Sequence, residues 1–205
     1  MRKKQLEILL SRLENIESPD VFLEQYSTPP GIAAEILYIG YSLGDIRGKA
    51  VVDLGCGNGI FAIGAAILGA EKSVGIDVAP GAVEKARENA SKLGVKAVFL
   101  HMDVEDVSGS YDTVIQNPPF GCQCKHADLP FVRKATEIGK VIYSLHHAET
   151  ERFIEQEFLR RNCRITHKER YAFPIKRTYK FHRKQEIKFD VVLIRAERLE
   201  ECPKM

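Results

Sequence analysis

The feature that most constrains the fold is an alternation of short β-rich runs with helical runs, which begins near residue 49. The runs KAVVDL, KSVGIDV and AVFLHMD predict strands, and IFAIGAAILGA and PGAVEKARENASKLG predict the helices between them. Strands that alternate with helices in this way form a parallel sheet with right-handed crossover connections. We therefore expect an α/β fold with a doubly wound, Rossmann-like sheet.

The second half of the chain extends the same sheet. The runs YDTVIQ and KVIYSLHH predict two further strands, and RITHKERYAF and EIKFDVVLIRA predict two closing strands. The connection between the closing strands is short, which favours an antiparallel hairpin at the sheet edge. We expect seven strands, six parallel and the last reversed, in a single domain that spans residues 1–205.

Two helices are expected ahead of the sheet, within residues 1–45. The first is an amphipathic helix that packs on the main body, because apolar residues recur at helical spacing. These residues are Leu6, Leu9, Leu10, Leu13 and Ile16. The second helix runs from about Ile32 to Leu43, after Thr28 and two prolines.

Composition limits which partners and which cellular compartment can be expected. The chain has 30 Lys and Arg against 28 Asp and Glu, and a net charge of +2 is too small to establish a nucleic-acid partner. In KRTYKFHRK, at 176–184, basic and aromatic side chains alternate, so this segment is either a solvated strand or a contact with an RNA backbone.

The five cysteines form no C-x-x-C pair, and charges interrupt the N-terminal apolar residues, so we expect no zinc ribbon and no secretory signal. A cytoplasmic protein with reduced thiols follows from this pattern. No run is long and apolar enough to span a membrane.

The loop VVDLGCGNGIF lies between the first predicted strand and its helix. Gly55 and Gly57 let the backbone turn tightly and approach a ligand at the helix N-terminus. The spacing also fits the dinucleotide fingerprint G-x-G-x-x-A, so the loop alone leaves a nicotinamide oxidoreductase open. The carboxylate of Asp53 is unfavourable beside a pyrophosphate but suits the positive charges of S-adenosylmethionine, which is the cofactor we predict.

Two further carboxylates end the next two predicted strands. Asp77 is placed to accept hydrogen bonds from ribose hydroxyls, a role that suits either cofactor. Asp103 is placed to accept the amino group of adenine. The alternative for Asp103 is a helix cap or a residue that stabilises its loop.

The segment IQNPPFG, at 115–121, indicates methylation of an amino group. An adenine amino nitrogen is a poor nucleophile because its lone pair is delocalised, and two acceptors aimed at its hydrogens would localise that pair. The Asn117 side-chain oxygen and the Pro118 carbonyl are the candidate acceptors, and Pro118 and Pro119 stiffen the loop without adding an N–H donor. Phe120 is a candidate for stacking on the target base. The alternative for this tetrapeptide is a simple turn.

Together these motifs resemble those of class I S-adenosylmethionine-dependent methyltransferases of the NPPF/Y group. DLGCGNG is similar to their cofactor loop, and NPPF is similar to their catalytic motif, which acts on base amino groups or on a glutamine amide. Over almost the whole chain, LEQYSTPPGIAAEIL, QNPPFG and YKFHRK resemble the archaeal and eukaryotic small-subunit rRNA N6-adenine methyltransferases, the family of methyltransferase-like protein five.

The resemblance implies a seven-stranded class I methyltransferase fold and methyl transfer to N6 of an adenine in RNA, with small-subunit rRNA as the expected substrate. It implies that an N-terminal segment closes over the cofactor through Gln25, Tyr26 and Thr28. It also implies a partner, a small zinc-binding activator protein that pairs along a sheet edge.

Two other functions stay open. A protein-glutamine N5 methyltransferase needs the same two acceptors, although Phe120 in place of tyrosine and the short N-terminal region weigh against it. A non-catalytic RNA-binding factor in ribosome assembly would keep the same fold. The loop after NPPF carries Cys122, Cys124 and His126, whose spacing does not suit zinc, so we expect reduced thiols in a substrate loop and no metal site.

Overall fold

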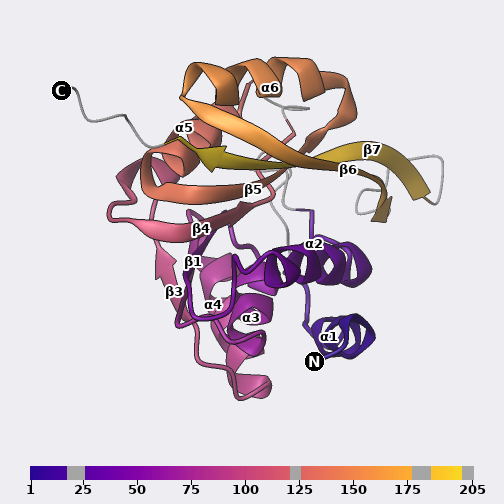
Figure 1. Ribbon diagram of the computed structural model, residues 1–205. Coiled ribbons are helices and arrows are strands. Elements are labelled where there is room, and N and C mark those ends of the chain that lie inside the picture. The colour runs from indigo at the N-terminus through magenta and orange to yellow at the C-terminus, as the bar shows by residue number, and fades with distance from the viewer. Residues whose placement is uncertain (18–25, 121–125, 177–185, 200–205) are drawn as a thin grey trace.

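The structure, a computed structural model, describes residues 1–17, 26–120, 126–176 and 186–199. Seven strands form one sheet in the order β3-β2-β1-β4-β5-β7-β6 (Figure 1). The strands are β1 (Ala50–Leu54), β2 (Lys72–Asp77), β3 (Val98–His101), β4 (Tyr111–Gln116), β5 (Gly139–His147), β6 (Cys163–Lys176) and β7 (Glu186–Arg198). The helices are α1 (Lys3–Leu10), α2 (Pro30–Ser42), α3 (Ile60–Ile67), α4 (Pro80–Lys92), α5 (Leu129–Ile138) and α6 (Glu151–Arg160), with short 3₁₀ turns η1 (Val104–Asp106) and η2 (Ala148–Thr150).

The strand directions match the predicted fold class. β7 pairs antiparallel with both β5 and β6, and the remaining pairs are parallel, so six strands share one direction and the last is reversed. The predicted closing hairpin is also present, with β6 at the sheet edge. The fold class predicted from the alternation of runs is therefore confirmed.

Helices cover both faces of the sheet because side chains on a buried strand alternate between the two faces. Val51 of β1 packs in the core with α1, α2 and α3, and the next residue, Val52, packs in the core with α5 and α6. α4 packs beside α3 around Phe99. Figure 1 shows α1 and α2 together beside the sheet, with α6 on the far side of β5, β6 and β7.

The first helix is shorter than predicted. α1 ends at Leu10, and neither Leu13 nor Ile16 is helical, so the prediction of a helix through Ile16 is wrong. The Ser11 hydroxyl bonds back to the Ile8 carbonyl at 2.8 Å, and a turn follows. Beyond that turn the backbone bonds to α4 instead of to its own preceding turn.

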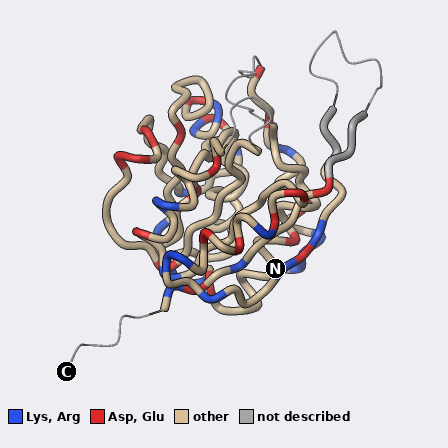
Figure 2. Tube along the Cα trace, turned by 90° about the horizontal axis from the view of Figure 1, so that it is seen from above, with Lys and Arg blue, Asp and Glu red and all other residues tan. Residues whose placement is uncertain are grey.

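Acidic and basic residues are nearly equal in number, and Figure 2 shows the two signs interspersed along the described trace. No helix in the described part of the chain is long and apolar enough to cross a membrane.

One buried ionic cluster ties the connection after α2 to β5 and β7. The Asp45 carboxylate accepts the Tyr143 hydroxyl at 2.6 Å and Arg195 Nε at 2.9 Å. Burial and the neighbouring Asp45 carboxylate raise the pKa of Tyr143. Arg195 also donates to Glu197 at 2.7 Å. Asp45 and Glu197 are therefore both carboxylate partners of a cation that is itself only 6% exposed, and Asp45 also accepts from Tyr143.

We expect Asp45→Ala to lower the free energy of unfolding by about 2 to 3 kcal/mol, because the buried Tyr143 hydroxyl loses its acceptor and Arg195 keeps a carboxylate partner only in Glu197. Urea denaturation measures the change. Glu35→Ala, which removes an exposed ion pair with Lys3, is the control and should cost less than about 1 kcal/mol. Equal losses in the two variants would contradict the role given to Asp45.

Candidate functional site

A cavity of about 240 Å³ lies where the carboxyl ends of β1, β2 and β4 meet. This is the point at which the strand order reverses, the usual ligand position in an open α/β sheet. The cavity is lined by Ile16, Tyr26, Ser27, Thr28, Gly55, Cys56, Gly57, Asn58, Phe61, Ile76, Asp77, Val78, Met102, Asp103, Val104, Asn117, Pro119, Ala127 and Phe131.

The glycine loop forms one wall of the cavity in a conformation that needs glycine. Gly57 and Gly59 have φ of 52° and 86°, in the left-handed region. A Cβ at Gly59 would also lie 3.0 Å from Ala86 and from the Phe99 ring, whereas one at Gly57 would meet nothing within 4 Å. Gly59 is thus required by the packing of the loop against Ala86 of α4 and Phe99 of β3, whereas at Gly57 only the backbone conformation favours glycine.

Asp77 joins the glycine loop to the end of β2. One carboxylate oxygen accepts the Gly57 N–H and the other accepts the Ala79 N–H, each at 2.9 Å. Burial raises the pKa of Asp77, although these backbone donors oppose the shift. The side chain lines the cavity, where it was predicted to meet ribose hydroxyls.

Asp103 caps a helix, which was the alternative considered for it, and it also lines the cavity, so its contact with the adenine amino group stays a prediction. One carboxylate oxygen accepts the Glu105 N–H at 2.9 Å and so caps η1. The same residue lines the cavity beside Met102 and Val104, two apolar side chains that sequence reasoning did not single out.

Asp53 lies one layer behind the loop and does not line the cavity. One oxygen accepts the Ala62 N–H at 3.1 Å, and the other, Oδ1, is buried without a partner. The side chain is 1% exposed, and burial raises the pKa of Asp53 to about 8. The carboxylates that reach the cavity wall are therefore Asp77 and Asp103.

The charge of the cavity suits a cation. Among the described residues that line it are two carboxylates and no Lys, Arg or His. A pyrophosphate would meet no basic side chain there, whereas the sulfonium and amino groups of S-adenosylmethionine are positive. The residues present therefore fit that cofactor, and their negative charge is unfavourable beside the pyrophosphate of a nicotinamide dinucleotide.

Asn117 faces the cavity from the end of β4, with its amide group oriented by Thr28. Asn117 Nδ2 donates to Thr28 Oγ1 at 3.1 Å, and Asn117 Oδ1 is buried without a partner. The amide nitrogen can only donate, so the oxygen is the atom of this side chain that can accept a hydrogen bond. This is the atom that the predicted chemistry requires.

The structure brings only part of the NPPF motif to the cavity. Pro119 lines it, whereas Pro118 and Phe120 do not. The Phe120 ring packs edge-on against Phe173, with ring centroids 6.0 Å apart. Phe131, near the start of α5, supplies an aromatic ring to the wall, and its only sequence signal is its position soon after NPPF.

Of the residues expected to close over the cofactor, Tyr26 and Thr28 line the cavity, and Gln25 lies outside the described residues. Cys122 and Cys124 also lie outside them. His126 is described, with a φ of 65° and its ring 4.8 Å from that of Phe153. Within the described ranges, no group of three or more His, Cys, Asp or Glu is placed to hold a metal ion.

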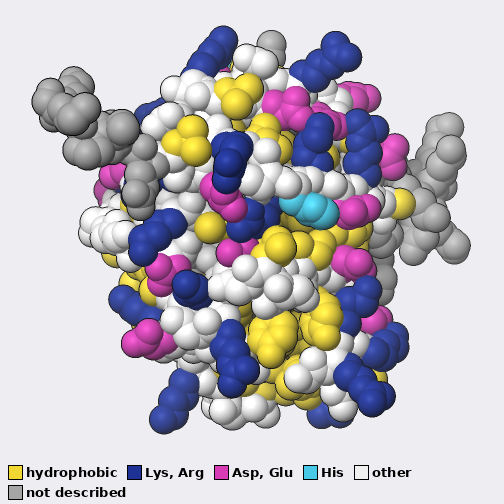
Figure 3. All heavy atoms as spheres, viewed as in Figure 1, with side chains coloured by type: hydrophobic (Ala, Val, Ile, Leu, Met, Phe, Trp, Pro, Cys, Tyr) yellow, Lys and Arg dark blue, Asp and Glu magenta, His cyan; other side chains and the backbone are white. Residues whose placement is uncertain are grey.

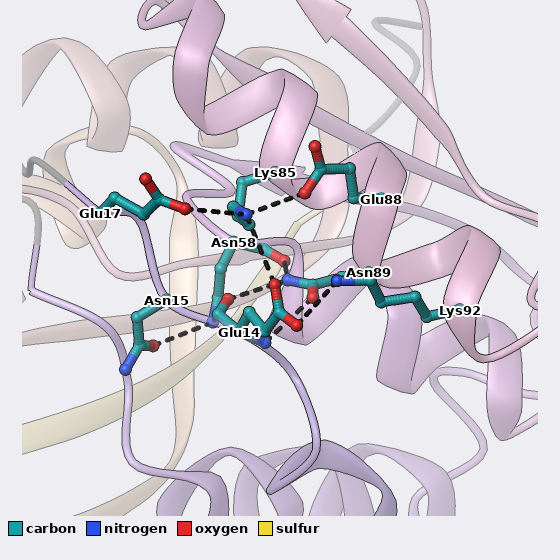
Figure 4. A network of polar contacts seen from close by, with 8 residues as sticks. All are labelled: Glu14, Asn15, Glu17, Asn58, Lys85, Glu88, Asn89 and Lys92. Atoms are coloured by element: carbon teal, nitrogen blue, oxygen red, sulfur yellow. Dashed lines mark hydrogen bonds and ion pairs between the residues drawn. The ribbon is translucent and has the colours of Figure 1, made fainter.

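Sequence reasoning missed a polar network that fastens the segment after α1 to the site (Figure 4). The Glu14 N–H donates to Asn89 Oδ1, and Asn89 Nδ2 donates to the carbonyls of Glu14 and Asn58, each at 3.0 Å. The Glu14 carboxylate pairs with Lys92 at 2.7 Å. Asn89 of α4 thus joins the glycine loop to the segment that carries Ile16 to the cavity wall.

Comparison with known proteins decides the family. Residues 42–118, which include the glycine loop, match the family model of ribosomal protein L11 methyltransferase (PrmA). The chain is 36% identical to the rRNA N(6)-adenosine-methyltransferase METTL5 of Danio rerio, over 95% of this chain and 98% of the relative. The chain belongs to the METTL5 family.

Solved structures agree with this assignment. A METTL5-family chain is expected to have a class I methyltransferase fold. A Pyrococcus horikoshii protein assigned as an RNA methyltransferase superposes on this chain with a TM-score of 0.91 at 42% identity. The superposition covers 98% of this chain and 99% of that one. Magnesium protoporphyrin IX methyltransferase from Synechocystis with bound SAH superposes with a TM-score of 0.66 over 82% of each chain, and at 18% identity it shows the shared fold alone. The predicted family, the class of enzyme and S-adenosylmethionine as its cofactor are confirmed.

Asn89→Ala is expected to weaken S-adenosylmethionine binding by about tenfold, because it removes the buried hydrogen bonds that hold Glu14 and Asn58 together. Isothermal titration calorimetry measures the dissociation constant. Glu88→Ala, which removes an exposed partner of Lys85 on the same helix, should leave it unchanged. Unchanged affinity in Asn89→Ala would show that the network does not support the cofactor site.

Asp53 should make stability depend on pH in a defined direction. The folded protein holds a proton that the unfolded chain releases above its ordinary pKa of 3.8, so the contribution of Asp53 is fully present below about pH 4 and is lost as pH rises through about 8. The amide that replaces the carboxyl group in Asp53→Asn stays neutral throughout. We expect the free energy of unfolding of the wild type to fall relative to that of Asp53→Asn between about pH 4 and about pH 8, as measured by denaturation without cofactor. Parallel pH profiles would contradict the raised pKa.

Proposed function

We propose that the protein transfers a methyl group from S-adenosylmethionine to the N6 amino group of an adenine in small-subunit rRNA. The observation that carries this proposal is the buried Asn117 oxygen, which has no partner among the described residues and lies beside a cavity with two carboxylates and no basic side chain. Membership of the METTL5 family, whose Danio rerio relative is named an rRNA N(6)-adenosine-methyltransferase, supports adenine in rRNA as the substrate.

The residues of the chain divide between holding the cofactor and orienting the base. The backbone of Gly55 and Gly57 and the carboxylates of Asp77 and Asp103 would hold S-adenosylmethionine, which supplies an electrophilic methyl group on a positively charged sulfur. Asn117 Oδ1 would accept one hydrogen of the target amino group and orient its lone pair. The Pro118 carbonyl, as the second acceptor, stays a prediction. The proton on the amino group leaves to water after transfer.

We also infer that residues 1–45 form an extension that closes over the cofactor. Tyr26 and Thr28 line the cavity, and Ile16 reaches it from the segment fastened by Asn89. Thr28 also orients Asn117 at 3.1 Å, which would couple closure to the position of the acceptor oxygen. The role of Gln25 in this closure stays a prediction.

The basic side chains that would contact RNA are spread over the face of the molecule drawn in Figure 3. Figure 3 shows hydrophobic side chains gathered in the middle and lower part of one face, with Lys and Arg spread around them. Most of the basic segment predicted to contact RNA, residues 177–184, lies outside the described residues. That contact and the cytoplasmic location stay predictions.

The zinc-binding activator is proposed to pair with β3. Of the two sheet edges, β3 presents Val98 and Leu100, which are 52% and 38% exposed. The β6 edge instead carries charged side chains, and Lys168 and Arg170 both pair with Glu151 of α6. Charged edges resist strand addition, whereas an apolar edge favours it.

The test of the reaction compares Asn117→Ala with the wild type. We expect a loss of kcat of about a hundredfold or more, with little change in cofactor affinity, because the acceptor acts where the reacting nitrogen changes. Labelled S-adenosylmethionine is supplied with small-subunit rRNA, DNA or a glutamine-containing peptide. Label recovered as N6-methyladenosine in rRNA is the expected result, and label only in the peptide would replace the proposal with glutamine methylation.

The proposed activator edge is tested by Val98→Lys combined with Leu100→Lys. We expect the double variant to lose co-elution with a small zinc-binding activator in size-exclusion chromatography, because buried lysines would oppose pairing at this edge. Leu159→Lys, at a 52% exposed position on α6, is the matched control and should still co-elute. Retained binding by the double variant would move the partner to another surface.

A further inference from the structure

A chain of four buried polar side chains lies behind Asn117. Gln116 Nε2 donates to Ser144 Oγ at 2.9 Å, Ser144 Oγ lies 2.6 Å from His146 Nε2, and His146 Nδ1 lies 3.1 Å from Asp128 Oδ2. Gln116 and Ser144 are 0% exposed, His146 is 1% exposed and Asp128 is 6% exposed. Polar groups buried this deeply are costly unless they are paired, so the chain needs an explanation.

The donors and acceptors fix a direction along the chain. The Asp128 carboxylate accepts, so His146 Nδ1 carries the hydrogen between them. His146 Nε2 is then an acceptor, so Ser144 donates its hydroxyl to it while the Ser144 oxygen accepts from Gln116. Hydrogen bonds therefore run in one direction, from Gln116 through Ser144 and His146 to Asp128.

The order Ser144, His146, Asp128 has the connectivity of a hydrolytic triad, but its placement excludes that role. Ser144 is fully buried, and it does not line the cavity. A substrate carbonyl has no access to its hydroxyl. The chain of hydrogen bonds therefore contributes by holding neighbouring residues in place and not by a reaction of its own.

The chain of hydrogen bonds links the residue before Asn117 to the residue after Ala127. Gln116 ends β4 immediately before Asn117 and is the register partner of Ser144 on β5. Asp128 immediately precedes α5, yet its side chain makes no capping hydrogen bond to that helix, although aspartate is a preferred capping residue. Its carboxylate bonds to His146 instead. Asn117 and Ala127, at the two ends of this segment, both line the cavity.

We propose that Gln116, Ser144, His146 and Asp128 form a positioning network that fixes the residues next to Asn117 and Ala127 and so sets where Asn117 meets the target amino group. The inference rests on the proposed function and adds positioning residues to it. Methyl transfer depends on the placement of the acceptor, and displacement of a reacting group by about 1 Å is enough to cost on the order of a hundredfold in rate. A network anchored on β5 holds Gln116, and with it the adjacent Asn117, through side chains that are buried in the sheet.

The test compares Ser144→Ala and Asp128→Ala with Ser73→Ala. Ser73 is a buried serine on β2 whose hydroxyl bonds to the Ala62 carbonyl at 2.6 Å, so its variant makes the same chemical change outside the network. We expect the two network variants to lose on the order of tenfold to a hundredfold in kcat, with the dissociation constant of S-adenosylmethionine within about twofold of the wild type. Ser73→Ala should retain the wild-type kcat. Asp128→Asn keeps an acceptor for His146, so it should retain most of the wild-type kcat.

A second readout does not require turnover. In the folded protein, the side-chain amide resonance of Asn117, which is bonded to Thr28, should shift in Ser144→Ala and Asp128→Ala and stay in place in Ser73→Ala. An unchanged Asn117 resonance in the network variants, or an equal loss of kcat in Ser73→Ala, would overturn the positioning role. Absence of N6-methyladenosine with the wild-type protein would overturn the proposed function instead, and the resonance would still decide whether the network positions Asn117.

Discussion

The site depends on the pairing of β1 with β4. These parallel strands are in register at Leu54 and Gln116, so Gly55 and Asn117 leave the sheet at the same level on neighbouring strands. The chain turns from β1 into α3, whereas beyond β4 it continues through the segment that leads to α5. The cavity lies between the two points where the chain leaves β1 and β4. A shift in the register of these strands would separate the glycine loop from Asn117.

The sequence was sufficient for features that are local in the chain. The alternation of runs predicted the strands, because period and length distinguish buried strands from helices, and the short connection between the closing strands predicted the reversed last strand. The glycine loop, Asp77 and Asn117 reach the cavity because each lies at or directly after the end of a strand, and the carboxyl ends of parallel strands lie at one edge of a sheet. Position at the end of a strand was thus a good predictor of proximity to the cavity.

Features that depend on contacts distant in sequence were not predictable in the same way. Asp53 lies within β1, not at its end, so its side chain is buried beneath the loop and bonds to α3. Leu13 and Ile16 keep helical spacing, but buried hydrogen bonds to Asn89 outweigh the weak preference of a short terminal helix. Phe131 carries no motif, and only the packing of α5 brings it to the cavity.

The contact between Glu14 and Asn89 has a consequence for how the protein is made. The two residues are 75 positions apart, so the N-terminal segment leaves the ribosome well before α4 exists to receive it. Contacts of such long sequence separation form late, because the intervening chain must be ordered first. One wall of the cavity is therefore assembled from residues that are synthesised before β1, and it is completed only after the first two strands and α4 have been translated.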